Sequence, residues 1–276
     1  TDFQAPLNNW DTSQVTTMYG MFYGCANFNE DLDNWDTSNV ERMNQMFDGC
    51  VVFDGDISTW NTGSVTTMVR MFYDCAVFTG GPVGLKNWDT SSNGEISNWD
   101  VSNVVYMFHM FRNTGAFNRD LNTWTTTSLQ GISDMFRDAT AFNGAIDNWD
   151  VSGVTQFQRM FQGATSFNRP LNNWNTSTGN QFQFMFDGAT SFNQNLNNWD
   201  VSNGNISTMF RDATAFNGDI STWSVGHVSQ FGAMFNNATN FDIDISSWDT
   251  SSGFNMIDMF SGATSFNQDL SSWYVA

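Results

Sequence analysis

The sequence predicts an α/β repeat solenoid, a right-handed stack of about eleven coils of 25 residues each. Three observations predict this fold class. Tryptophans return at a nearly constant step, Met-Phe pairs return at the same step, and the apolar spacing inside one repeat changes from that of a strand to that of a helix. We therefore expect a parallel sheet on one face of the stack and short helices on the other.

The tryptophans set the period of the repeat. Most of the 12 tryptophans follow one another at a step of 25 residues, and the exceptions are steps of 28, 11 and 24. Residues in the same slot of successive coils lie over one another, so we expect ladders of stacked tryptophans and phenylalanines in the core. The tryptophan positions are Trp10, Trp35, Trp60, Trp88, Trp99, Trp124, Trp149, Trp174, Trp199, Trp223, Trp248 and Trp273.

One half of each repeat predicts a strand, and the other half predicts a short helix. Trp149 and Val151 alternate with polar neighbours, which is the period of a strand with one buried face. In the first repeat, Val15, Met18 and Phe22 recur at the spacing of one helix face. The polar residues at 11–13 precede that face and are suitable N-caps.

The repeat unit resembles a known family. Residues 121–126 (Leu-x-x-Trp-x-Thr) and 146–151 (Ile-x-x-Trp-x-Val) resemble the LxxLxL strand of leucine-rich repeats, with tryptophan in the middle slot. The whole unit, as in 154–174, resembles the BspA-type leucine-rich-repeat surface proteins and is close to the 25-residue repeat of mycoplasma lipoproteins. The resemblance implies a leucine-rich-repeat-like stack, display outside the cell or on its surface, and adhesion or partner binding.

Composition and charge exclude several functions. The chain has 9 basic and 28 acidic residues and a net charge of −19, so the basic surface that nucleic acids require is absent. The sequence contains no run of 18 apolar residues, so we expect no direct insertion into a membrane. The two histidines, His109 and His227, occupy unrelated slots, and the carboxylates recur in repeated positions. We therefore expect a protein that is not an enzyme, because a catalytic site is singular.

The outward positions beside the tryptophans form the candidate ligand-binding face. They are expected to make two columns of short polar side chains, repeated at the strand spacing of about 4.8 Å. Three interpretations stay open: turns and caps, calcium binding by closely spaced carboxylates, and recognition of a protein or glycan on another surface. The candidates are Asn9, Asp11, Asn34, Asp36, Asp89, Asp100, Asn148, Asp150, Asn198, Asp200 and Asp249.

Two further slots have structural interpretations. Cys25, Cys50 and Cys75 share a slot that later repeats fill with Ala, so we expect free, buried thiols rather than a zinc site. The residue after the repeated Phe is Asn or Asp in nine repeats, as at Asn143 and Asn168. We expect these side chains to satisfy backbone groups of neighbouring coils.

The chain is expected to be a single repeat domain over 1–276, with an irregular insertion or truncated coil at 79–98 and the character of an excerpt from a longer protein. Sequons at Asn175, Asn205 and Asn237 arise readily in so asparagine-rich a chain. The favoured function is a non-catalytic, extracellular or cell-surface module that binds a protein or glycan and mediates adhesion. The alternative is a self-assembling segment of a filament or surface layer. A calcium-stabilised solenoid is a lesser alternative, and no other cofactor is expected.

Overall fold

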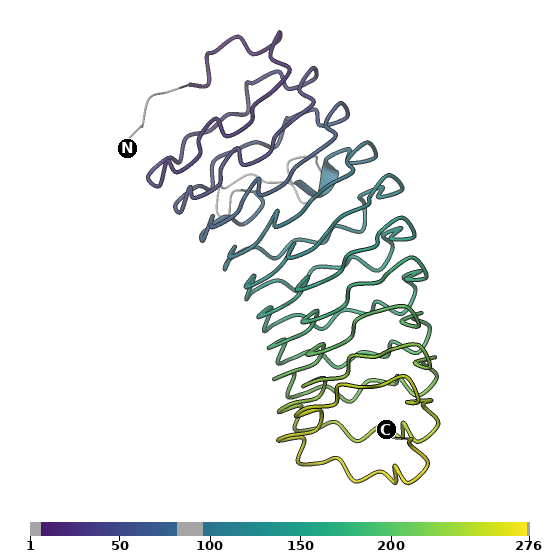
Figure 1. The fold of residues 1–276 in the computed structure, drawn as a ribbon. Coiled ribbons are helices and arrows are strands. Elements are labelled where there is room, and N and C mark those ends of the chain that lie inside the picture. The colour runs from purple at the N-terminus through teal and green to yellow at the C-terminus, as the bar shows by residue number, and fades with distance from the viewer. Residues whose placement is uncertain (1–6, 82–95, 275–276) are drawn as a thin grey trace.

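The computed structural model describes residues 7–81 and 96–274. In these ranges the chain winds through successive coils of similar shape, and each coil lies on the next along an elongated stack (Figure 1). The two described ends of the chain therefore lie at opposite ends of the stack.

The predicted α/β architecture is wrong. The described residues contain one helix, the 3₁₀ helix η1 (Ile96–Asn98), and no strand or sheet. Neighbouring coils are joined by isolated parallel bridges, one residue from each coil. The bridges link Thr17, Arg42, Thr67, Tyr106, Gly131, Gln156, Gln181 and Asn205 in succession, and Gln230 with Asn255. None of the described helices is long and apolar enough to cross a membrane.

The predicted helical half is a run of tight turns. The N–H groups of Met18 and Phe22 donate to carbonyls of the next coil, both at 2.9 Å, rather than to the carbonyl four residues earlier in the same coil. The N–H groups of Met21 and Cys25 donate to the carbonyls three residues before them, which closes the turns. The apolar spacing therefore marks the buried residues correctly, but hydrogen bonds between coils replace those of a helix.

Residues in the left-handed backbone conformation make these turns possible. Ten of the described coils contain two residues with positive φ, four positions apart. Glycine occupies both positions in the first coil, whereas Arg70 and Asp74 adopt φ of 56° and 59°. Such a conformation costs a residue with a Cβ about 1–2 kcal/mol. The N–H groups of Arg70 and Asp74 donate to the next coil at 2.9 and 3.0 Å, which offsets that cost.

The predicted aromatic ladders are confirmed. Consecutive tryptophans of the ladder stack with ring centroids 5.9–6.4 Å apart. The indole N–H of Trp149 donates to the carbonyl of Leu121 in the preceding coil at 2.9 Å, and that of Trp174 donates to Ile146 at 3.0 Å. Trp149 and Trp174 thus fill the core and also satisfy buried carbonyls, whereas the buried indole N–H of Trp99 has no hydrogen-bond partner among the described residues.

The predicted irregular region at 79–98 falls largely outside the described residues, which omit 82–95. On either side of that interval the stack is continuous. Trp99 stacks on Trp60 with ring centroids 6.2 Å apart, and the N–H of Ile96 donates to the carbonyl of Gly80 at 3.3 Å.

Candidate functional site

Six aspartates of the predicted face form one edge of the stack, which we call the Asp edge. Each carboxylate accepts the backbone N–H of the serine two residues later, at 2.9–3.1 Å. This contact defines an Asx turn, which lies directly after the tryptophan of the repeat. The members are Asp11, Asp36, Asp100, Asp150, Asp200 and Asp249.

Serine contacts also favour the ionised form of five of these carboxylates. Hydrogen bonds from the Ser13 hydroxyl and N–H lower the pKa of Asp11 below its ordinary value. The equivalent serine contacts lower the pKa of Asp36, Asp100, Asp150 and Asp249. The Asp edge is therefore an array of anionic turns, with one oxygen of each carboxylate engaged by its own turn.

The predicted asparagines lie beside the Asp edge. Asn9, Asn34, Asn148 and Asn198 are exposed. The backbone N–H groups of the last three donate to an asparagine side chain of the preceding coil at 2.9–3.0 Å. Asp89 lies outside the described residues.

The interpretation of the Asn/Asp slot after the repeated Phe is confirmed. The Oδ1 atom of Asn143 accepts the N–H of Asn168 at 2.9 Å, and Asn168 in turn accepts the N–H of Asn193 at 2.9 Å. The ladder continues through Asn217 and Asp242. Its amide groups are thereby engaged in joining coils.

The predicted burial of the cysteine slot is confirmed for Cys50 and Cys75, whereas Cys25 in the first coil is half-buried. All three thiols are free. The Sγ atoms of Cys50 and Cys75 each donate to a phenylalanine carbonyl of the preceding coil at 3.0 Å. Burial raises the pKa of Cys50 to about 12 and that of Cys75 well above its ordinary value, so both remain protonated thiols. Across the described residues, no group of three or more histidine, cysteine or acidic side chains is arranged to hold a metal ion.

A different surface carries the most distinctive cluster of side chains. Around the bridge residues of the first four described coils, nine residues line an open surface hollow of about 490 Å³, which we call the aromatic groove. They are Tyr19, Arg42, Asn44, Thr66, Thr67, Val69, Val105, Tyr106 and Phe108. Four coils supply these residues, so the groove exists only once the coils are stacked.

The aromatic residues of the groove are partly exposed. Tyr106 and Phe108 stack with ring centroids 5.6 Å apart and an interplanar angle of 14°. Tyr106 is 42% exposed and Tyr19 is 62% exposed. Gly131 in the next coil makes room for Phe108, because a Cβ at Gly131 would lie 2.2 Å from the end of the phenylalanine ring.

Polar groups of the groove retain free donors. The Oδ1 atom of Asn44 accepts the Thr67 hydroxyl at 2.8 Å and the N–H of Val69 at 3.1 Å, which orients the amide. The Asn44 amide nitrogen has no partner among the described residues. The same holds for the guanidinium of Arg42, which makes no hydrogen bond, ion pair or ring contact within the described ranges.

Arg42 differs in this respect from the other arginines. Three of them pair with aspartates at 2.7–3.2 Å: Arg70, Arg137 and Arg211. Arg112 and Arg159 lie over aromatic rings, and Arg119 and Arg169 donate to backbone carbonyls.

Sequence reasoning missed the aromatic groove because its residues fall in slots without a consensus. A signal was nevertheless present. The slot two residues after the bridge reads Tyr19, Asn44, Val69 and Phe108 in the groove and becomes uniformly polar in the next four coils, Ser133, Gln158, Gln183 and Ser207. Variation in a slot that repetition would otherwise keep constant marks this part of the surface.

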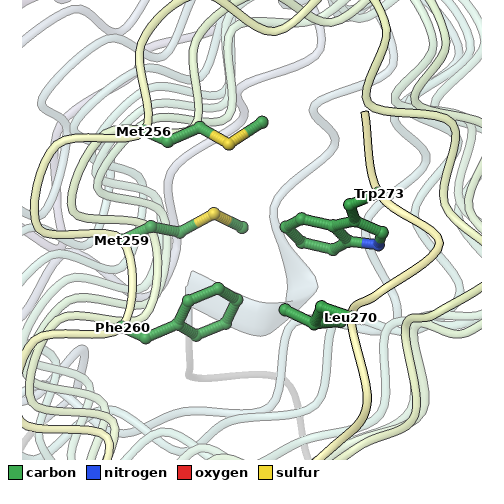
Figure 2. Close-up of a pocket in the computed structure, with 5 residues that line it drawn as sticks. All are labelled: Met256, Met259, Phe260, Leu270 and Trp273. Atoms are coloured by element: carbon green, nitrogen blue, oxygen red, sulfur yellow. The ribbon is translucent and has the colours of Figure 1, made fainter. Parts of the chain in front are cut away.

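A second hollow, of about 290 Å³, lies at the last described coil (Figure 2). Met256, Met259 and Phe260 extend toward Trp273 and Leu270 from the opposite side of the coil. The adjacent Phe254 and Ile257 are 77% and 73% exposed. This end of the described stack is thus strongly apolar.

Stacked 25-residue coils, joined by ladders of identical side chains, define a repeat protein. The chain belongs to the family described as Mycoplasma protein of unknown function, DUF285. The family model matches four successive segments, residues 1–94, 89–153, 131–205 and 203–276. The comparison with curated proteins gives no match. The closer resemblance to BspA-type leucine-rich-repeat proteins stays a prediction.

Proposed function

We propose that this chain is a non-catalytic repeat module of an extracellular or cell-surface protein that binds a protein or glycan partner through the aromatic groove. One observation carries the proposal. In a surface built by repetition, this groove brings together a partly exposed aromatic stack, a free amide and an unpaired arginine. Exposed aromatic side chains and arginine are enriched where proteins bind partners.

The composition of the groove favours binding over catalysis. Its nine lining residues include no histidine, carboxylate or thiol. The hydroxyls of Thr66 and Thr67 therefore lack an adjacent general base among the lining residues. Such a site is suited to holding a ligand unchanged.

The Asp edge supports the proposal less strongly. The same Asx turn recurs in six coils, and each turn uses its carboxylate to shape the backbone. A surface on which every coil presents the same turn offers little basis for discriminating one partner from another.

The test is binding of the purified chain to two immobilised panels, one of oligosaccharides and one of extracellular-matrix proteins. We expect retention on at least one panel, and Tyr106→Ala should weaken it by tenfold or more. Asp150→Asn, which keeps the turn, serves as the matched control outside the groove and should bind like the parent chain. Absence of binding to both panels contradicts the proposal, as does loss of binding in Asp150→Asn alone.

Self-association of copies is a second candidate function, favoured by the two exposed apolar side chains Phe254 and Ile257. Contact between two such surfaces would bury apolar area, and each Å² buried would stabilise the contact by roughly 25 cal/mol. Sedimentation velocity should then show concentration-dependent oligomers, and Ile257→Asp should return the chain to monomers. A parent chain that sediments as a monomer at all concentrations contradicts assembly.

A further inference from the structure

The aromatic groove has the side chains that recognise a particular kind of ligand. We propose that it binds an oligosaccharide that carries a carboxylate or sulfate group. This inference rests on the proposed function and specifies the partner of the same site. Three features of the groove support it, namely the aromatic stack, the neutral polar groups and the unpaired arginine.

The aromatic stack suits a sugar ring. A pyranose presents a face of C–H groups, and an aromatic ring attracts such a face through dispersion and through its negative π surface. Tyr106 and Phe108 lie almost parallel, 5.6 Å apart, and Tyr106 stays 42% exposed. The Tyr106 hydroxyl lies 3.5 Å from the side-chain carbonyl of Gln130 in the next coil, which helps to hold the ring in place.

The neutral polar groups suit sugar hydroxyls. Asn44 has its carbonyl oxygen occupied by Thr67 and Val69, so its amide nitrogen is left to donate into the groove. Thr66 and Thr67 line the same hollow. Hydroxyls and amides are the short donors and acceptors that pair with ligand hydroxyls without adding charge.

Arg42 favours a ligand that carries a negative charge. Its guanidinium is unpaired within the described residues, although the chain has 28 acidic residues and a net charge of −19. A planar guanidinium presents paired donors that match a carboxylate or sulfate. The neighbouring Glu41 is exposed and does not line the groove, so it leaves Arg42 available there.

The dimensions of the groove suit a short oligosaccharide. Its residues come from four consecutive coils. At ~4.8 Å per coil, the groove extends over about 14 Å along the stack. This length exceeds that of one sugar ring, so a chain of sugars is favoured over a monosaccharide.

The test is isothermal titration calorimetry of the complete chain with three probes. Trigalacturonic acid carries carboxylates, a heparin-derived tetrasaccharide carries sulfates and carboxylates, and maltotriose is neutral. We expect at least one acidic probe to bind at sub-millimolar concentration and more tightly than maltotriose. Arg42→Gln should weaken acidic binding by about tenfold, and Tyr106→Ala should weaken it further.

Matched variants control for nonspecific effects. Tyr23→Ala removes an exposed tyrosine outside the groove, and Arg169→Gln removes an arginine at a distant corner. Both should bind like the parent chain. The inference is overturned if neither acidic probe binds at millimolar concentration, or if Arg42→Gln binds the acidic probes as the parent does.

The outcomes also separate this inference from the proposed function. Suppose the chain binds an immobilised protein, and Tyr106→Ala abolishes that binding, while no oligosaccharide binds. The aromatic groove is then a protein-binding site, and only the sugar inference fails. If Tyr106→Ala changes binding on neither panel, the proposed function fails as well.

Discussion

The Asp edge and the aromatic groove occupy different positions in the repeat, and their residues follow opposite rules. At the Asp edge, six coils repeat one Asx turn with nearly the same hydrogen-bond length. In the groove, Tyr19, Arg42 and Tyr106 occupy positions that other coils fill with unlike residues. Repetition marks the contacts that every coil needs in order to stack, whereas a singular cluster is free to specify a partner.

The largest expected loss of stability follows a substitution in the core, and it exceeds the loss expected on either surface. Trp149→Ala removes a ring stacked between Trp124 and Trp174 and its hydrogen bond to Leu121. We expect a loss of roughly 3–5 kcal/mol in the free energy of unfolding. Urea unfolding followed by circular dichroism measures it. Tyr106→Ala is the surface counterpart and should change stability by less than about 1 kcal/mol. Equal losses in the two variants would contradict the assignment of Tyr106 to a surface groove.

The next largest effect is expected from a substitution that displaces an aromatic ring of the groove. Gly131→Ala places a Cβ 2.2 Å from the end of the Phe108 ring, so the ring must move out of its stack with Tyr106. We expect groove-dependent binding to fall by about tenfold, with a destabilisation of about 1–3 kcal/mol. Binding to the panel that retains the parent chain measures the first quantity, and urea unfolding measures the second.

Gly115→Ala is the matched control for this prediction. A Cβ at Gly115 meets its nearest neighbour at 3.6 Å, an ordinary contact. This variant should bind like the parent chain. Unchanged binding in Gly131→Ala would show that the stacked position of Phe108 is unimportant for the ligand.

A smaller effect tests the Asp edge. Asp150→Ala removes one Asx turn on a largely exposed site, so we expect a loss below about 1 kcal/mol after solvent screening. Asp150→Asn keeps the acceptor oxygen but not the charge, so it should lose less stability at pH 7 than Asp150→Ala does. Thermal melts of both variants measure the difference, and identical losses would contradict a turn-forming role.

The same edge predicts how stability depends on pH. The folded pKa of Asp150 lies below the unfolded value, since Ser152 hydrogen-bonds the charged form. The unfolded chain therefore binds more protons in acid, and this stabilisation is present above the ordinary pKa of 3.8 and is lost as pH falls through the lowered folded pKa. Melting temperatures of the parent chain and of Asp150→Asn, measured from pH 7 to strongly acidic pH, should therefore converge at the acidic end. Asp150→Asn should fall less steeply.

The smallest expected effect concerns calcium. The described residues provide no cluster of acidic side chains around a common point, since each Asp-edge carboxylate is engaged by its own serine. We expect the melting temperature to be the same in excess chelator and in millimolar calcium. A higher melting temperature in calcium would contradict this expectation, and it would indicate that the Asp edge binds the metal.

The sequence by itself determined which residues stack. The 25-residue step assigned Trp149 to a ladder with Trp124 and Trp174, and the repeated Asn after Phe predicted the joining of coils by Asn143 and Asn168. The period can be read directly from the residue types. Identical residues in one slot meet whenever coils are stacked in register. These features therefore required no knowledge of the backbone.

Only the tertiary structure decided the path of the backbone and the location of the groove. An apolar spacing of three and four fits a helix, but it also fits successive turns whose N–H groups, such as that of Met18, donate to the next coil. The pattern of side chains does not say which carbonyl a backbone donor will find. Tyr19, Arg42 and Tyr106 are far apart along the chain, and they line one hollow only because four coils lie side by side.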